Sequence, residues 1–285
     1  MGGHSRLIAR IFIFICVVVC VPQPSFAAAW LLPEHEGLVI ANVAQYTSCN
    51  TWNTEGQLSS TPCFNQFTVN PYFEYGAFSD VTVGLNPFFQ RISQSGNVSP
   101  FDLVNITPFA RFLIQQHHWT TRSVQVGYNQ PFTSSTFGGT PTPSSASSAS
   151  SAYGIENRQR FVDVRFLYGI GGAFDPKERK VWYADFEAAY RPYFDGAADQ
   201  LHFDIMLGLK VLSKTLIFEL QEKNTWSLHN PSNIREPDYN LYSLQPSIIY
   251  WFIANLGVQI GLQQDFYGNN VGMGTTPFGA VWWKF

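Results

Sequence analysis

Long segments in which apolar and polar residues alternate recur along nearly the whole chain of 285 residues. In residues 201–212 every second position is apolar, and these positions are Leu201, Phe203, Ile205, Leu207, Leu209 and Val211. A period of two indicates a β-strand with one apolar and one polar face. Because the same pattern returns in segment after segment, the sequence predicts an all-β fold.

The alternation predicts twelve strands, at 37–46, 65–77, 81–92, 103–114, 121–132, 157–170, 180–194, 201–212, 215–226, 241–252, 255–267 and 275–285. A tilted strand needs about 9 to 11 residues to cross the hydrocarbon of a bilayer, whereas strands of soluble proteins usually have about 5 or 6. The predicted strands have the longer length. We therefore expect a transmembrane antiparallel up-and-down β-barrel of about twelve strands.

The composition agrees with a barrel that has a lipid-facing wall and a polar interior. Charged residues make up 13% of the chain and aromatic residues 16%, and the mean hydropathy is -0.05. A membrane barrel combines these values because only half of its strand residues face lipid. The formal net charge is -3 with no basic run, so no nucleic-acid partner is expected.

Residues 1–27 have the layout of a secretory signal peptide. His4, Arg6 and Arg10 precede an apolar run at 11–21, which is too short to span a bilayer. The small-x-small pattern Ser25-Phe26-Ala27 predicts cleavage after Ala27, with Ala28 and Ala29 as alternative sites. An uncleaved anchor is the alternative. The expected products are a removed signal peptide and a single barrel domain at 28–285.

Cleavage would leave two cysteines, Cys49 and Cys63, because Cys16 and Cys20 lie in the signal peptide. An even pair in an exported chain predicts one disulfide, here in the first outer loop. Two free thiols are the alternative.

The connections between the predicted strands alternate in length. With the first strand starting in the periplasm, the outer loops are 47–64, 93–102, 133–156, 195–200, 227–240 and 268–274. The inner turns are 78–80, 115–120, 171–179, 213–214 and 253–254, mostly shorter, as bacterial barrels require. The loop at 133–156 is rich in Ser, Thr, Pro and Gly and is expected to be mobile.

Aromatic residues near the strand ends predict two girdles at the membrane interfaces. The inner girdle would contain Tyr75, Phe78, Trp119, Trp182, Trp251 and Trp283, and the outer one Tyr46, Tyr128, Phe132, Phe194, Trp226 and Tyr267. The chain ends in Phe285, with Trp283 and Val281 at the same parity. This ending resembles the C-terminal assembly signature of outer-membrane barrels, so Phe285 is the candidate assembly signal.

Several short motifs resemble a family of small bacterial outer-membrane barrels called XagA-like. They are Ala29-Trp30-Leu31-Leu32-Pro33-Glu34-His35-Glu36-Gly37, Phe73-Glu74-Tyr75-Gly76, Phe161-Val162-Asp163-Val164-Arg165, Asp199-Gln200-Leu201-His202-Phe203-Asp204 and Gly268-Asn269-Asn270-Val271-Gly272-Met273-Gly274. The chain also looks like outer-membrane proteins associated with phenol-degradation pathways. It departs from the pattern at His35, where a basic residue is expected. The resemblance implies an outer-membrane barrel and, more weakly, transport or surface-glycan roles; it supplies no catalytic residues.

Charged residues collect at the strand positions that alternate with the apolar ones, so their side chains lie on the other face of each strand. They are therefore expected to line the lumen. They are Glu74, Arg111, Asp163, Arg165, Asp185, Glu187, Arg191, His202, Asp204, Lys210, Glu219, Lys223 and Asp265. Both signs occur, so most should pair. Either they form a structural network that keeps the interior charges neutralised, or they line a path for a charged solute. Twelve strands lie between filled eight-stranded barrels and open sixteen-stranded porins, so strand number does not decide between the two.

Residue types for catalysis do not occur in a recognisable arrangement. His202 and Asp204 lie on the same face of a strand, so His202 could act as a general base that Asp204 orients. Acids and bases on one face more often form salt bridges. His117 and His118 are adjacent, and adjacent residues of a strand point apart, which disfavours a shared metal. No P-loop, zinc signature or dinucleotide fingerprint occurs. We therefore expect no enzyme activity, no catalytic residue, no cofactor and no metal.

The sequence thus predicts a barrel of the bacterial outer membrane that acts as a channel or facilitator for a small, unidentified solute. Its other expected partners are the lipid of the outer membrane and the barrel-assembly machinery. The alternative is a plugged structural or surface-interaction barrel, linked to surface-polysaccharide assembly.

Overall fold

A computed structural model describes residues 29–132, 159–174, 180–194, 198–212, 215–228 and 239–285. The predicted signal peptide at 1–27 and the predicted mobile loop at 133–156 lie outside these residues. The strands are β1 Gly37–Trp52, β2 Leu58–Phe78, β3 Val81–Gln94, β4 Asn97–Val98, β5 Asp102–His117, β6 Thr120–Pro131, β7 Phe161–Ala173, β8 Val181–Arg191, β9 Gln200–Val211, β10 Leu216–Ser227, β11 Asn240–Ile253, β12 Leu256–Asn269 and β13 Val271–Lys284. The described part of the chain contains no helix that could span a membrane.

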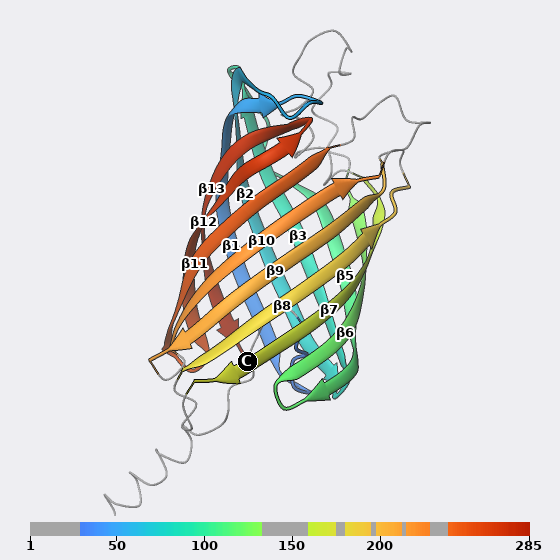
Figure 1. Cartoon of the computed structure of the whole chain (residues 1–285), viewed down its shortest axis with the longest axis vertical. Coiled ribbons are helices and arrows are strands. Elements are labelled where there is room, and N and C mark those ends of the chain that lie inside the picture. Colours follow the sequence, from blue (N-terminus) through green and yellow to red (C-terminus); the bar gives the residue numbers. More distant parts are fainter. Residues whose placement is uncertain (1–28, 133–158, 175–179, 195–197, 213–214, 229–238) are drawn as a thin grey trace, which may run out of the picture.

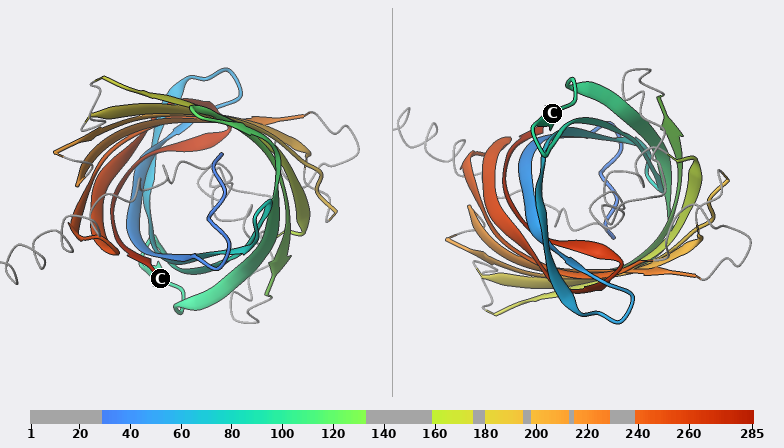
Figure 2. Two further views of the ribbon diagram at one scale, coloured as in Figure 1. Left: turned by 90° about the horizontal axis from the view of Figure 1, so that it is seen from below. Right: turned by 90° about the horizontal axis from the view of Figure 1, so that it is seen from above.

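The strands close into one antiparallel barrel, which confirms the predicted fold class (Figures 1 and 2). Each long strand pairs with its neighbours in sequence, β2 pairs with β3, and the last strand β13 pairs with the first strand β1. The short β4 pairs only with the end of β3, so the wall itself has twelve strands. Closure leaves no unpaired edge, which a sheet surrounded by lipid requires.

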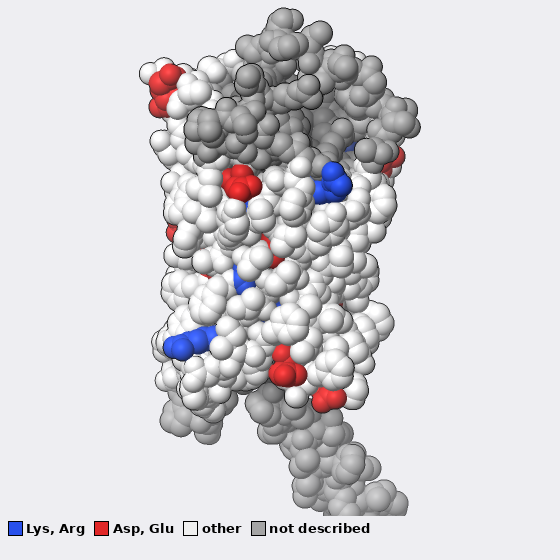
Figure 3. Space-filling view, turned by 90° about the vertical axis from the view of Figure 1, so that its right-hand side faces the viewer, with Lys and Arg blue, Asp and Glu red and all other residues white. Residues whose placement is uncertain are grey.

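The alternate strand positions that carry apolar residues point their side chains outward, away from the barrel interior. On β9 the exposed side chains are Phe203, Leu207 and Leu209, while His202 and Lys210 are buried. The same division holds on β10, where Phe218 and Leu220 are exposed on either side of the half-buried Glu219. Figure 3 shows one side of this wall, where few charged side chains reach the described surface. An apolar band around a closed barrel is the surface that lipid tails cover.

Leu207 gives a direct test of the outward parity. It lies in the middle of β9 and is 50% exposed. Leu207→Arg should lower the free energy of unfolding by roughly 2–4 kcal/mol near the bilayer midplane, whereas Leu207→Ala should cost far less. Urea unfolding in lipid vesicles, followed by the heat-dependent gel shift of folded barrels, measures both. Equal tolerance of the two variants would show that Leu207 does not face lipid.

Two predicted outer loops are wrong, because strands continue through them. In place of the loop 47–64, β1 and β2 stay paired up to Trp52 opposite Leu58. In place of the loop 268–274, β12 and β13 are joined at Asn270, which has a positive φ of 54°. Asparagine tolerates this left-handed conformation better than most residues, so it suits a tight turn. The polar residues of these segments belong to strands that extend past the apolar band.

The predicted cysteine pair lies within the extended β1–β2 hairpin, not in a loop. Cys49 is bonded to Cys63 across the two strands. The register is irregular there, since Ser48 faces Phe64 while Asn50 faces Ser60. The bond therefore closes the irregular part of the hairpin.

Replacing both Cys49 and Cys63 by serine should lower the free energy of unfolding by about 3 kcal/mol, the value for a closed loop of this size. Mass spectrometry of the wild-type protein, alkylated without reductant, should find neither cysteine labelled. Two alkylated thiols in protein taken from native membranes would contradict the bond. Equal unfolding midpoints for wild type and double variant would contradict its contribution to stability.

Two aromatic residues assigned to the girdles face the interior instead. Tyr46 is 4% exposed, and its hydroxyl donates to the Gly272 carbonyl at 3.2 Å. A Cβ at Gly274 would come within 2.1 Å of the Tyr46 ring, so the neighbouring glycine provides the room for that ring. Trp251 is 6% exposed and packs with Tyr183, Ile217 and Ile249. Position near a strand end is thus not sufficient to place an aromatic residue in a girdle.

Candidate functional site: the polar barrel interior

All thirteen residues predicted to line the lumen are buried or half-buried in the structure. Most of them have an exposed apolar neighbour on the same strand, as Glu74 has in Phe73 and Tyr75, and Asp265 has in Phe266. Because side chains alternate along a strand, this pattern directs the charged groups into the barrel. Seven of the thirteen are acids, five are bases and one is His202.

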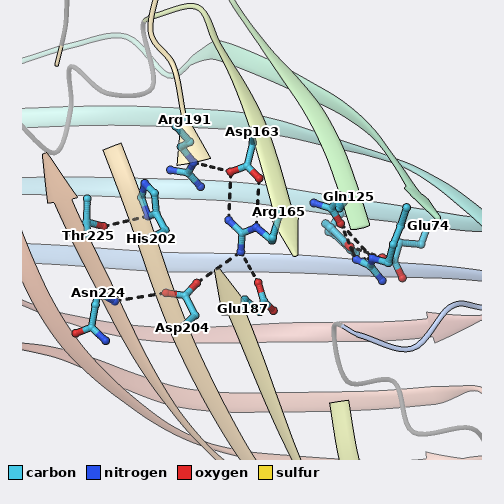
Figure 4. Close-up of polar contacts among 12 residues, drawn as sticks. Glu74, Gln125, Asp163, Arg165, Glu187, Arg191, His202, Asp204, Asn224 and Thr225 are labelled. Atoms are coloured by element: carbon cyan, nitrogen blue, oxygen red, sulfur yellow. Dashed lines mark hydrogen bonds and ion pairs between the residues drawn. The ribbon is translucent and has the colours of Figure 1, made fainter. Parts of the chain in front are cut away.

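Arg165 is the centre of the largest charged cluster (Figure 4). Glu187 on β8 and Asp204 on β9 are directly opposed in the strand register. The Arg165 guanidinium lies between them: its Nη1 pairs with Glu187 and is 3.6 Å from Asp204 Oδ2. Its Nη2 is 3.2 Å from Asp163 Oδ2 on its own strand. One arginine thus contacts three carboxylates from three neighbouring strands.

Arg191 and His202 extend this cluster. Arg191 Nε lies 2.6 Å from Asp163 Oδ2, so Asp163 is shared by two arginines. His202 does not pair with Asp204. Its Nδ1 is 3.2 Å from Thr225 Oγ1 (Figure 4), and its Nε2 is 2.9 Å from Gln200 Oε1. The arrangement of a histidine oriented by Asp204 is therefore not formed.

A second ion pair joins β2 and β5. Arg111 Nη2 is 2.9 Å from Glu74 Oε1, and both side chains are almost fully buried. Arg111 also donates to Gln125 Oε1 through Nε and Nη2, at 3.1 and 2.9 Å. The guanidinium is thus held by several partners, which is what a buried charge requires.

The remaining interior charges are bound mainly by uncharged groups. Glu219 accepts hydrogen bonds from Tyr183 Oη at 2.5 Å, Ser247 Oγ at 3.4 Å and Gln259 Nε2 at 3.3 Å. Lys223 Nζ donates to Gln245 Oε1 at 2.6 Å. Asp265 accepts from Ser243 Oγ at 2.8 Å and from the Gly274 amide at 3.1 Å. Lys210 Nζ lies 5.1 Å from the centre of the Tyr183 ring.

Asp185 does not join the charged cluster around Arg165, although most interior charges were expected to pair. Its strand parity groups it with the acids that Arg165 and Arg191 neutralise, but in the register it lies opposite Gly169 and Met206. Neither carboxylate oxygen has a hydrogen-bond partner among the described residues. Parity fixes the face of a strand, whereas the height along the barrel depends on register, which the sequence pattern does not give.

The segment Ala29–Glu36 brings its first five residues, which are buried or half-buried, into the interior, while Glu34, His35 and Glu36 are exposed. The strand pattern did not reveal this segment. It enters the ring of strands before β1 begins (Figure 2, dark blue). Ala29 and Leu32 are 0% and 2% exposed. The Leu32 amide donates to Thr82 Oγ1 at 3.1 Å, and Arg111 Nη1 donates to the Trp30 carbonyl at 3.4 Å. We call Ala29–Glu36 the inner segment.

Two glycines of the barrel wall leave room for the inner segment, because a side chain at either position would collide with it. A Cβ at Gly76 would lie 2.0 Å from the Pro33 carbonyl oxygen, and a Cβ at Gly169 would lie 2.2 Å from the Trp30 ring. Trp30 also packs against the cluster of Tyr183, Ile217 and Trp251. The inner segment therefore occupies part of the interior space.

The prediction of interior residues considered charged side chains alone and so did not include the uncharged glutamines of the interior. Gln66 and Gln90 are 2% exposed and bond to each other at 3.0 Å, and Gln259 connects Glu219 to the Trp282 indole. They share the inward parity with the charged residues, so a search for any polar residue at that parity would have found them. The interior is thus amide-rich as well as charged.

The described residues contain no group of three or more His, Cys, Asp and Glu side chains able to hold a metal ion. His117 Nε2 is 2.8 Å from Gln115 Nε2, and the His118 ring packs against Trp119. The chemistry that this interior offers is recognition of polar or charged groups by carboxylates, guanidinium groups and amides.

Comparison with solved structures finds outer membrane channels. An outer membrane channel from Pseudomonas putida F1 matches with a TM-score of 0.66 at 12% identity, over 92% of this chain and 100% of that chain. The translocator domain of autotransporter NalP from Neisseria meningitidis (TM-score 0.46, 11% identity, 99% and 96% coverage) and the CymD monoaromatic hydrocarbon channel (0.40, 10%, 89% and 88%) are more distant. No family model matches the chain, and no curated protein matches it. The first comparison shows that the chain shares the fold of an outer membrane channel barrel.

Proposed function

We propose that the protein is a channel of the bacterial outer membrane through which small polar solutes diffuse. The observation that carries the proposal is the contrast between the two faces of the wall. The outer face is apolar, as lipid requires, and the inner face presents ionised groups and amides along several strands. Replacing buried ion pairs by apolar side chains of similar volume is often neutral or stabilising, so stability alone does not require a charged interior.

The inner segment limits the size of solute that the channel would pass. Trp30 and the cluster around Tyr183 occupy part of the interior, and the ion pairs of Arg165 reach across neighbouring strands. We therefore assign small solutes, and the paired acids and bases favour polar ones. The shared fold with an outer membrane channel is consistent with this assignment.

Liposome swelling with the purified barrel tests the proposal. Vesicles containing folded protein should swell in isotonic solutions of small polar solutes such as glycine, and the rate should fall steeply from there to disaccharides. Vesicles with heat-unfolded protein are the matched control. Absence of swelling with every solute would contradict a channel.

The second candidate is a plugged barrel that presents its loops for surface interactions, including the surface-glycan role that the XagA-like resemblance implies. The inner segment favours it, because a fixed segment inside a barrel also stabilises a closed state. Folded barrel that is impermeable in the swelling assay would support this second function. We propose no enzyme activity for either candidate.

A further inference from the structure

The outward wall of β1, β2 and β3 changes from apolar to polar over three neighbouring rows of side chains. Residues that face each other in the strand register lie on the same side of the sheet. Starting from the middle of the strands, the rows are Val43–Val69–Phe89, then Gln45–Phe67–Arg91, then Thr47–Asn65–Ser93. The residues that alternate with them, such as Gln66 and Gln90, are buried inside. The edge of the apolar band therefore crosses this wall at the second row.

Arg91 is a cation at this edge without a counter-charge among the described residues. Its side chain is exposed, and its one described contact is the Phe67 ring, whose centre lies 5.9 Å from the guanidinium carbon. The interior residues Arg111 and Arg165, in contrast, pair with carboxylates. A guanidinium group offers a planar set of N–H donors that matches phosphate oxygens. At the edge of a lipid-facing band, the anion within reach is a lipid phosphate.

Aromatic rings and polar side chains flank Arg91 on the two sides of this edge. Phe101 is 46% exposed, and its ring centre lies 6.0 Å from those of Phe67 and Phe89. In the polar row, Thr47 Oγ1 donates to Asn65 Oδ1 at 2.9 Å. The rings offer a surface for an acyl chain, and the hydroxyl and amide groups offer hydrogen bonds to a sugar. We call these residues the Arg91 patch, which consists of Thr47, Asn65, Phe67, Phe89, Arg91 and Phe101.

The Arg91 patch lies at the outer end of the barrel. Arg91 is three residues from the end of β3 at Gln94, at the same end as the β1–β2 hairpin (Figure 1, upper end). The short turns at 79–80, 118–119 and 254–255 lie at the opposite end. Bacterial barrels have short turns on the periplasmic side. The patch therefore faces the outer leaflet, which in bacterial outer membranes consists of a phosphorylated glycolipid with several acyl chains.

We propose that the Arg91 patch binds this phosphorylated glycolipid of the outer leaflet. Arg91 binds a phosphate, the three phenylalanine rings contact an acyl chain, and Thr47 and Asn65 bind the sugar. The proposal rests on the placement of the barrel in the outer membrane and holds whether or not the barrel conducts a solute. A failed lipid test therefore leaves the result of the swelling assay unaffected.

Native mass spectrometry of the folded barrel with rough-type lipopolysaccharide measures the binding. Arg91→Gln should weaken it about fivefold, the effect of one basic residue near a membrane surface. Arg122→Gln is the matched control and should bind as the wild type does. Arg122 is also exposed on the outward wall, over the Tyr168 ring, but it lies beside the inner turn at 118–119. Equal binding by Arg91→Gln and wild type would overturn the proposal, and so would a loss confined to Arg122→Gln.

Lipopolysaccharide stripped of its phosphates is the second probe, and it tests the site in the wild type without any substitution. The wild type should bind it about fivefold more weakly than the phosphorylated form. Equal binding of the two forms would contradict a phosphate contact. Displacement of the phosphorylated form by millimolar inorganic phosphate would assign the site to the dissolved ion and overturn the docking of a lipid.

Discussion

Arg165→Ala should be among the most destabilising single substitutions in the barrel wall, with an expected loss of about 3–5 kcal/mol, the usual cost of removing one partner of a buried ion pair. The reason is the register. Glu187 and Asp204 stand directly opposite each other, and Arg165 Nη1 contacts both carboxylates. Without the guanidinium, two acids face each other in a partly dehydrated interior. Urea unfolding in vesicles measures the loss.

Arg122→Ala is the matched control for the loss of an arginine. Arg122 is exposed and donates to Gln115 Oε1 at 3.1 Å, so its removal should cost no more than about 1 kcal/mol.

Adding Glu187→Gln to Arg165→Ala should recover part of the stability, because it removes one of the two unpaired acids. Additive effects of the two substitutions would contradict the direct pair. Any folded Arg165→Ala barrel that conducts should prefer cations more than the wild type does.

Deletion of Phe285 should prevent most of the exported chain from assembling into folded barrel. Phe285 closes the seam between the last and first strands: the Gly37 amide donates to the Phe285 carbonyl at 2.7 Å, and the Phe285 amide donates to the Gly37 carbonyl at 3.0 Å. Each of these bonds contributes about 1 kcal/mol. Loss of the terminal residue also removes the ring that packs over Gly37 and beside Trp283.

Phe285→Ala separates the two contributions, because it keeps the backbone bonds and removes the ring. Folded barrel is measured by the heat-dependent gel shift of outer-membrane fractions, and unfolded chain by its accumulation in the periplasm. If Phe285→Ala assembles normally and the deletion does not, the seam bonds are decisive. Normal assembly of the deletion variant would contradict the role of Phe285 as an assembly signal.

The strands and their two faces could be predicted because both depend on a local pattern. A period of two locates β9 and places Leu207 outside and Lys210 inside without knowledge of any other strand. The hairpin beyond Tyr46 could not be predicted in this way. There the strands rise past the apolar band, so polar residues such as Thr47 and Asn65 replace the alternation while the backbone pairing continues.

The interior could be predicted only in part, because pairing depends on register and on a segment with no periodicity. Parity placed Glu187 inside, but only the register shows it opposite Asp204. The inner segment, with Trp30 and Leu32, has neither alternation nor helical spacing. Its position follows from Gly76 and Gly169, whose missing side chains leave room for it, and a single sequence does not reveal such a match in shape.

The most direct test of the account is single-channel recording in planar bilayers. If the interior is a conduction path narrowed by the inner segment, the wild type should give discrete current steps. Trp30→Ala should then give larger ones, because it removes the ring that packs over Gly169. Trp283→Ala, on the outer face at 49% exposure, is the control and should conduct as the wild type does. Folded protein that gives no current steps, as wild type and as Trp30→Ala, would contradict the channel.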